Sequence, residues 1–96
     1  MHIYEFQEMM RQLYFKRDFE RGVTGTYNWF VDEVGELGEE IQKGTDREAT
    51  EKEFADVIAW LASLANIMGI DLEKSAINKY NNKCPKCQKL PCQCIF

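Results

Sequence analysis

Two pairs of acidic residues have the spacing best suited to chemistry in this chain of 96 residues. Glu33 and Glu36 form a Glu-x-x-Glu pair, and Glu53 and Asp56 form a Glu-x-x-Asp pair. Residues three apart on a helix share a face, with about 5–6 Å between their Cβ atoms. Each pair can therefore direct two carboxylates toward one point. Ligands that are all oxygen favour Mg²⁺ or Mn²⁺ over zinc or copper.

The helices that carry these pairs are predicted to form a hairpin. An apolar stripe predicts a helix from about residue 28 to Gly44, and the capping-box pattern Thr45-x-x-Glu48 predicts a second helix over about 47–68, ending at Gly69. If the two helices are antiparallel, the acidic pairs lie roughly 12–17 Å and 9–14 Å from the turn, at about 1.5 Å per residue. Both pairs also flank the apolar stripe, so we expect four carboxylates to converge at one height.

Converging carboxylates repel one another unless a cation lies between them. Two unit charges about 4 Å apart interact by about 4 kcal/mol at an effective dielectric near 20. The alternative interpretation is that these acids form an ordinary solvated helix face. A di-iron bundle is less consistent with the sequence, because such sites use Glu-x-x-His motifs and the only histidine is the distant His2.

The remaining segments predict an all-α fold, an antiparallel bundle of about four helices. A first helix is expected over about 3–20, a loop over 22–26, and a last helix over about 72–82 that Asp71 caps. We expect a helical domain over 1–83 and a cysteine-rich tail over 84–96. The helix over 47–68 is apolar on nearly all sides, which indicates burial in a homodimer or homotetramer.

Composition and charge exclude several classes of protein. A hydrophobic fraction of 45% with 29% charged residues is typical of a globular chain rather than a disordered one. The net charge is −4, and residues 32–56 hold ten acids and three bases. This acidic block would repel phosphate, so a general nucleic-acid partner is not expected. The start of the chain lacks the pattern of a signal peptide, and no stretch is long enough to span a membrane, so we expect a cytoplasmic protein.

The acidic motifs resemble those of the MazG-like, all-α nucleotide pyrophosphohydrolases. That family has Glu-Glu-x-x-Glu followed by Glu-x-x-Asp, and this chain has Asp32-Glu33-Val34-Gly35-Glu36 and then Glu53-Phe54-Ala55-Asp56. The flanking segments are also similar, over about residues 27–82. The sequence departs from the pattern at Asp32, where the family often has glutamate.

The resemblance implies hydrolysis of a nucleoside triphosphate to monophosphate and pyrophosphate. Glu33, Glu36, Glu53 and Asp56 would hold Mg²⁺ or Mn²⁺, and one of them, or a nearby acid, would orient the attacking water. A phosphoribosyl-ATP pyrophosphohydrolase of the same superfamily is an alternative. A non-catalytic metal-binding helical module is another.

Further residues are candidates for holding the nucleotide. Trp60 lies one turn after Asp56 and Trp29 one turn before Glu33, so each could stack on a base, although tryptophan more often packs in a core or interface. The family often uses basic and amide residues from the end of its last helix on phosphates. This suggests Lys79, Asn82 and Lys83 in this chain, where solvated side chains are the simpler interpretation.

All four cysteines lie within the tail, at Cys84, Cys87, Cys92 and Cys94. Four thiolates satisfy the tetrahedral geometry of zinc, so a structural zinc site is one interpretation. The spacing is tighter than in most zinc ribbons. Two disulfides, expected only in an oxidising or hyperthermophilic setting, and free thiols are the alternatives.

Overall fold

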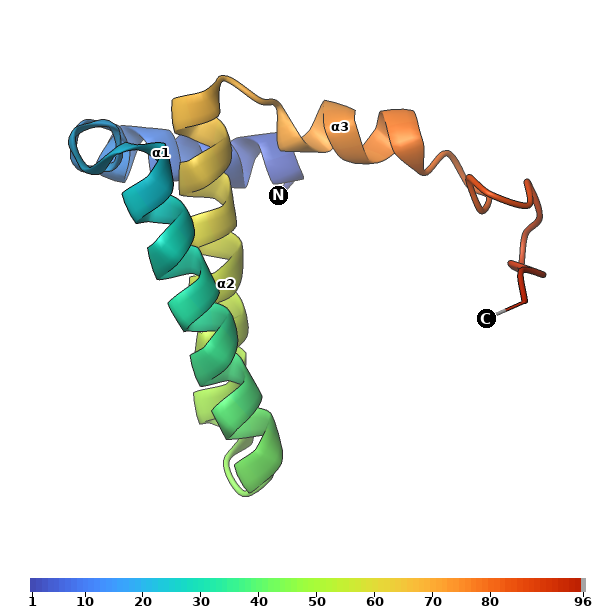
Figure 1. Cartoon of the computed structure of the whole chain (residues 1–96), viewed down its shortest axis with the longest axis horizontal. Helices are drawn as coiled ribbons and strands as arrows, with labels where there is room; N and C mark the ends of the chain where they lie inside the picture. The colour runs from blue at the N-terminus through green and yellow to red at the C-terminus, as the bar shows by residue number, and fades with distance from the viewer. Residues whose placement is uncertain (96) are drawn as a thin grey trace.

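A computed structural model describes residues 1–95, and no strand occurs in that range. Helix α1 spans Ile3–Lys43, α2 spans Arg47–Met68 and α3 spans Leu72–Lys79, followed by an irregular C-terminal segment (Figure 1). The all-α prediction is confirmed. The count is three helices in the described residues rather than about four, because the predicted helices 3–20 and 28–43 are joined in α1. Phe96, the last residue of the predicted tail, lies outside the described residues.

Helix α1 changes direction at Gly22, which has φ 87° and ψ 170°. In Figure 1 the part of α1 before this point runs across the other helices, and the part after it runs alongside α2. This backbone conformation is open almost only to glycine, so one residue is enough to turn the chain. The predicted break is therefore present at Gly22. The predicted loop over 22–26 is wrong beyond it, because the helix resumes at once and Thr26 is fully buried.

The second part of α1 and α2 form the expected antiparallel hairpin (Figure 1). Gly44 ends α1 in the left-handed conformation, with φ 62°. Asp46 caps α2 by accepting a hydrogen bond of 3.0 Å from the backbone N–H of Ala49. The predicted cap at Thr45 is thus one residue early, since the Asp46 carboxylate is the group placed to accept this bond. The bounds of α2 agree with the prediction.

Helix α3 begins as expected after Asp71, whose side chain accepts a hydrogen bond from the N–H of Lys74. It ends at Lys79 rather than near residue 82, because Tyr80 is extended and Asn82 has a φ of 62°. No single helix in residues 1–95 is long and apolar enough to cross a membrane. Helices α2 and α3 reach that length and hydropathy only together, and they meet at a bend of 98°.

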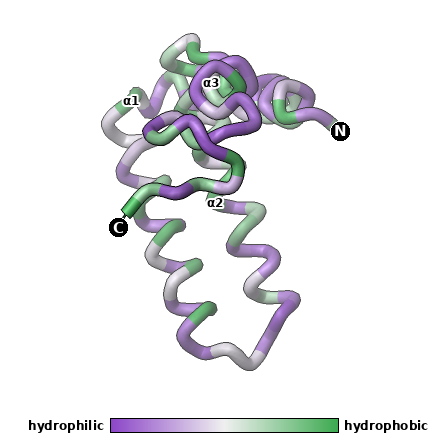
Figure 2. The backbone as a smooth tube through the Cα atoms, turned by 90° about the vertical axis from the view of Figure 1, so that its right-hand side faces the viewer, coloured by the Kyte–Doolittle hydropathy of each residue, from purple (hydrophilic) through white to green (hydrophobic). Residues whose placement is uncertain are grey.

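The single chain covers little of its own apolar surface. Among residues 1–95, the buried apolar side chains are Met10, Ala62 and Ala65. The radius of gyration is 15.7 Å, against about 12–13 Å for a compact domain of this length. Figure 2 shows hydrophobic positions recurring along the hairpin. Large apolar side chains with more than half of their surface exposed include Leu13, Phe19, Ile41, Phe54 and Ile77.

Candidate active site

Three carboxylates from the two helices of the hairpin converge on one point. One oxygen from each of Glu33, Glu53 and Asp56 lies within 4.8 Å of the others. Glu33 comes from α1, and Glu53 and Asp56 come from α2, as the matched heights predict. Glu36 is exposed and is not one of the three, although its charge acts on both Glu33 and Glu53.

The surroundings of this cluster disfavour its negative charge. Partial burial raises the pKa of Glu33 to about 7, and the charges of Glu36, Asp56 and Glu53 act in the same direction. Loss of surrounding water also raises the pKa of Glu53, with the neighbouring acids adding to the effect. Glu33 Oε2 and Glu53 Oε2 are buried without a hydrogen-bond partner. Buried, unpartnered oxygens among like charges fit a hard divalent cation, which prefers carboxylate ligands.

A cavity of about 270 Å³ opens beside the carboxylates and shares Asp56 with them. Its lining includes two arginines, Arg17 and Arg21, from the first part of α1. Arg21 Nη1 donates to Asp18 Oδ1 at 3.0 Å and to Thr26 Oγ1 at 3.3 Å. Asp18 is only 2% exposed, and its Oδ2 has no partner. The cavity therefore offers guanidinium groups, suited to phosphate oxygens, next to the three carboxylates.

The turn at Gly22 is what brings these arginines to the cavity. The chain changes direction there, so residues before the turn cross α2 at the level of Asp56, Ala59 and Ser63. Gly25 contributes through its lack of a side chain, because a Cβ atom there would lie 2.9 Å from Cγ of Arg21. The Arg21 side chain occupies this space.

The two tryptophans lie together, but they stack on each other. Their ring centroids are 5.6 Å apart with an angle of 12° between the ring planes. The guanidinium carbon of Arg21 lies 4.8 Å from the Trp60 ring centroid. Trp60 lines the cavity, whereas Trp29 packs on Trp60 and keeps 49% of its surface exposed.

The structure does not bring the other predicted nucleotide-binding residues to this cavity. Lys79 lines a different cavity, formed with Tyr80 and the cysteine segment, and its Nζ lies 5.6 Å from the Tyr80 ring centroid. Asn82 and Lys83 follow α3 in the irregular segment, which Figure 1 shows leading away from the hairpin. Within one chain, α3 leaves the end of α2 opposite the hairpin turn, so its last residues point away from Asp56.

Comparison with known families decides the identity of the domain. Residues 21–88 match the family model described as the MazG nucleotide pyrophosphohydrolase domain, which is more than half of the chain. The chain belongs to the MazG family. The resemblance of the acidic motifs is thereby confirmed. A search of curated proteins gave no match.

The MazG match begins at residue 21, whereas part of the cavity lies before it. Tyr14, Arg17 and Asp18 line the cavity and were not among the sequence candidates, nor was Arg21. A signal for two of them is present in the sequence, as Asp18-x-x-Arg21 is an oppositely charged pair directly before a glycine. That spacing alone does not distinguish a buried pair from an ordinary surface pair.

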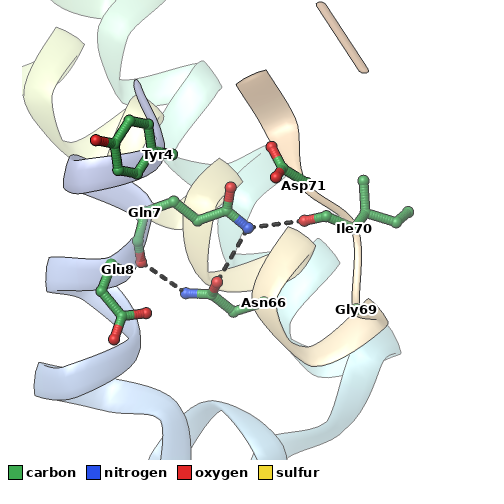
Figure 3. Close-up of a pocket in the computed structure, with 7 residues that line it drawn as sticks. All are labelled: Tyr4, Gln7, Glu8, Asn66, Gly69, Ile70 and Asp71. Carbon is green, nitrogen blue, oxygen red and sulfur yellow. Dashed lines mark hydrogen bonds between the residues drawn. The ribbon is translucent and has the colours of Figure 1, made fainter. Parts of the chain in front are cut away.

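A larger cavity in the MazG chain, about 490 Å³, is lined by amide groups that already bond to one another (Figure 3). Gln7 Nε2 donates to Asn66 Oδ1 at 3.0 Å and to the carbonyl oxygen of Ile70 at 2.7 Å. Asn66 Nδ2 donates to the Gln7 carbonyl at 3.1 Å, and the N–H of Leu72 donates to Gln7 Oε1. These bonds join α1 to the end of α2 and the start of α3. We therefore assign the cavity a structural role.

Proposed function

We propose that this MazG-family protein hydrolyses nucleoside triphosphates to nucleoside monophosphates and pyrophosphate in the presence of Mg²⁺ or Mn²⁺. The observation that carries the proposal is the position of the arginine-lined cavity beside the converging carboxylates, with Asp56 shared between them. Binding a triphosphate requires a metal cation to neutralise part of its negative charge and positively charged side chains to bind its remaining oxygens. This arrangement offers both.

Glu33, Glu53 and Asp56 are the proposed cation ligands, and Glu36, one turn from Glu33, completes the set. The donor set fits because it consists of carboxylate oxygens alone, two of them buried without partners. A bound cation would neutralise part of the phosphate charge and would make a water molecule bound to it more acidic.

The protein's own residues supply the rest of the chemistry. Arg17 and Arg21 bind oxygens of the triphosphate, and Asp18 holds Arg21 in position through the bond at 3.0 Å. Trp60 forms an apolar wall for the base or sugar. A carboxylate of the cluster accepts the proton as water cleaves the bond between the α and β phosphates, and pyrophosphate leaves.

The testing experiment measures pyrophosphate release from a panel of ribo- and deoxyribonucleoside triphosphates with Mg²⁺. Wild type should release pyrophosphate, and Glu53→Gln should reduce the rate by at least about 100-fold. Glu51→Gln is the matched control, because Glu51 lies on the same helix with a side chain that is 65% exposed and outside the cluster. It should retain the wild-type rate.

Two results would overturn the proposal. Release of orthophosphate in place of pyrophosphate would show cleavage at the other anhydride bond. Folded wild type that is inactive on the whole panel would exclude these substrates. Phosphoribosyl-ATP is then the next compound to assay, and binding of Mg²⁺ without turnover on it would favour a non-catalytic module.

We also propose that the active form is a homodimer or homotetramer. The single chain leaves Phe19 66% exposed and Ile41 57% exposed, and its apolar α2 is covered on one side by α1. A wholly apolar cavity of about 180 Å³ between Ile58, Leu61 and Leu72 adds to this uncovered surface. Apolar surface on this scale is typical of a protein that associates with itself.

A further inference from the structure

The segment after α3 contains a second group of ligand-type side chains, far in sequence from the carboxylates. The Sγ atoms of Cys84, Cys87, Cys92 and Cys94 all lie within 4.8 Å of one another. The distance is 3.6 Å between the Sγ atoms of Cys84 and Cys94, and 4.0 Å between those of Cys87 and Cys92. Sulfurs around a tetrahedral zinc ion, with Zn–S bonds of about 2.3 Å, lie about 3.8 Å apart. The two measured distances bracket this value.

The backbone of the segment is arranged around these sulfurs. The N–H of Gln93 donates to Cys87 Sγ at 3.4 Å, and the N–H of Cys94 donates to Cys92 Sγ at 3.3 Å. The loop through Cys84 is closed by two bonds, from the Gln88 N–H to the Cys84 carbonyl and from the Cys84 N–H to the Lys89 carbonyl. Backbone donors directed at sulfur favour the thiolate form, which is the form that binds metal.

The burial pattern is the reverse of that expected for a small apolar core. Cys84, Cys87 and Cys94 are half-buried, whereas Leu90 is 79% exposed and Ile95 is 100% exposed. The segment therefore covers three of its four cysteines in part, leaves Cys92 exposed, and turns its large apolar side chains outward. A segment this short, without an apolar core of its own, usually depends on a metal or on disulfides for its structure.

We propose that the four cysteines bind a single structural Zn²⁺ ion as a tetrahedral tetrathiolate site. Four Zn–S bonds form, and each cysteine that is still a thiol releases its S–H proton to solvent as its bond forms. The site carries net negative charge, which Lys83, Lys86 and Lys89 on the same segment offset. Four sulfurs within 4.8 Å of one another fit one ion rather than a cluster of several irons.

This site lies only partly outside the MazG match, which includes Cys84 and Cys87, and it takes no part in the proposed reaction. The matched residues end at 88, so Cys92 and Cys94 lie beyond them. No carboxylate lines the adjoining cavity of about 340 Å³, which includes Lys79, Tyr80 and Cys84. Zinc binding can therefore be tested independently of pyrophosphate release.

The experiment is a titration of the full, reduced, metal-free chain with Co²⁺ in the absence of oxygen, followed by displacement with Zn²⁺. We expect sulfur-to-cobalt charge-transfer absorption and the visible bands of tetrahedral cobalt, saturating at one ion per chain and abolished by one equivalent of Zn²⁺. The double variant C87S/C92S should lose these bands. Its far-UV circular dichroism should stay close to that of wild type, because the helices end at Lys79.

Matched controls separate this site from the carboxylates. The variant Gln93→Ser changes a side chain within the segment but leaves the backbone N–H of residue 93 in place, so it should retain the cobalt spectrum. Glu53→Gln should also retain it.

Trypsin should cleave after Lys83, Lys86 and Lys89 more slowly with zinc than with chelator. Three results would overturn the proposal: reduced wild type without thiolate absorption, isolated protein containing two disulfides and no metal, or iron in place of zinc.

Discussion

At the residue scale, the carboxylates of the hairpin carry an electrostatic penalty in the absence of a cation. Glu33 and Glu53 each have a buried oxygen without a partner, and both have a raised pKa from loss of water and like charges. The metal-free protein therefore contains repulsion that a cation would remove. The proposed function of these residues and the stability of the protein are therefore opposed.

We expect Glu33→Gln to raise the melting temperature of the metal-free protein by a few degrees, because it removes one charge from the cluster. The same change should remove most of the stabilisation that Mg²⁺ gives to wild type. Thermal unfolding in chelator and in Mg²⁺ measures both effects. Glu51→Gln should behave as wild type, and equal stabilisation of Glu33→Gln by Mg²⁺ would contradict the assignment of Glu33.

Gly25→Ala tests whether the position of Arg21 matters for catalysis. The added methyl group would lie 2.9 Å from Cγ of Arg21, so the side chain must shift away from Thr26 and Trp60. We expect kcat/KM for pyrophosphate release to fall by roughly 10-fold or more, since misplacement of a binding group by about 1 Å can cost up to 100-fold. Gly38→Ala is the control, because nothing lies within 4 Å of its added Cβ. An unchanged kcat/KM in Gly25→Ala would exclude this role.

At the scale of the elements, α1 depends on one glycine for its change of direction. Gly22 has a backbone conformation that residues with a Cβ rarely adopt. The turn places the first part of α1 across the hairpin, where Asp18 and Arg21 reach the cavity beside Asp56. A straight helix would carry these residues away from α2.

We expect Gly22→Ala to lower the free energy of unfolding by about 1–3 kcal/mol, because the alanine must adopt a strained conformation or the turn must move. Gly38→Ala in the regular part of α1 should instead raise it by up to about 1 kcal/mol through helix propensity. Denaturant unfolding of both variants measures the difference. Equal effects of the two substitutions would show that the turn carries no strain for alanine.

The Gln7 and Asn66 side chains fasten α1 to the junction of α2 and α3. Asn66→Ala removes a donor and an acceptor from this network and should cost about 1–3 kcal/mol of stability. A double-mutant cycle with Gln7→Ala should give a coupling of at least about 0.5 kcal/mol. The kcat for pyrophosphate release at a temperature where the variants remain folded should stay at the wild-type value. A specific loss of kcat would assign this cavity to the reaction.

At the scale of the whole molecule, the exposed apolar surface is the dominant feature. The radius of gyration of 15.7 Å and the few buried apolar side chains among the described residues show that this chain lacks a compact apolar core of its own. We therefore expect another copy of the chain to cover part of this surface.

We expect wild type to sediment as a dimer or tetramer and Ile41→Glu to shift it toward the monomer, because a charge at a contact between copies costs burial energy. Gln42→Glu is the matched control, since it adds the same charge at the neighbouring exposed position. Analytical ultracentrifugation measures both. Wild type that sediments as a monomer at micromolar concentration would contradict self-association.

The sequence alone determined the features that local periodicity controls. The bounds of α2 and the shared height of Glu33, Glu53 and Asp56 follow from spacing along helices, which have a fixed rise and period. The break at Gly22 and the cap at Asp71 follow from the local preferences of glycine and aspartate. The family motif made Glu33 and Glu53 recognisable for the same reason.

The tertiary structure decided what depends on contacts between distant segments. The way in which the first part of α1 crosses the hairpin decides three features of the site. Arg21 faces the cavity, Asp18 is buried, and the two tryptophans stack on each other. One glycine sets that crossing through its φ and ψ, and a sequence pattern marks the position of such a turn but not its direction. The gathering of four sulfurs likewise depends on the folding of an irregular segment, for which no helical period exists.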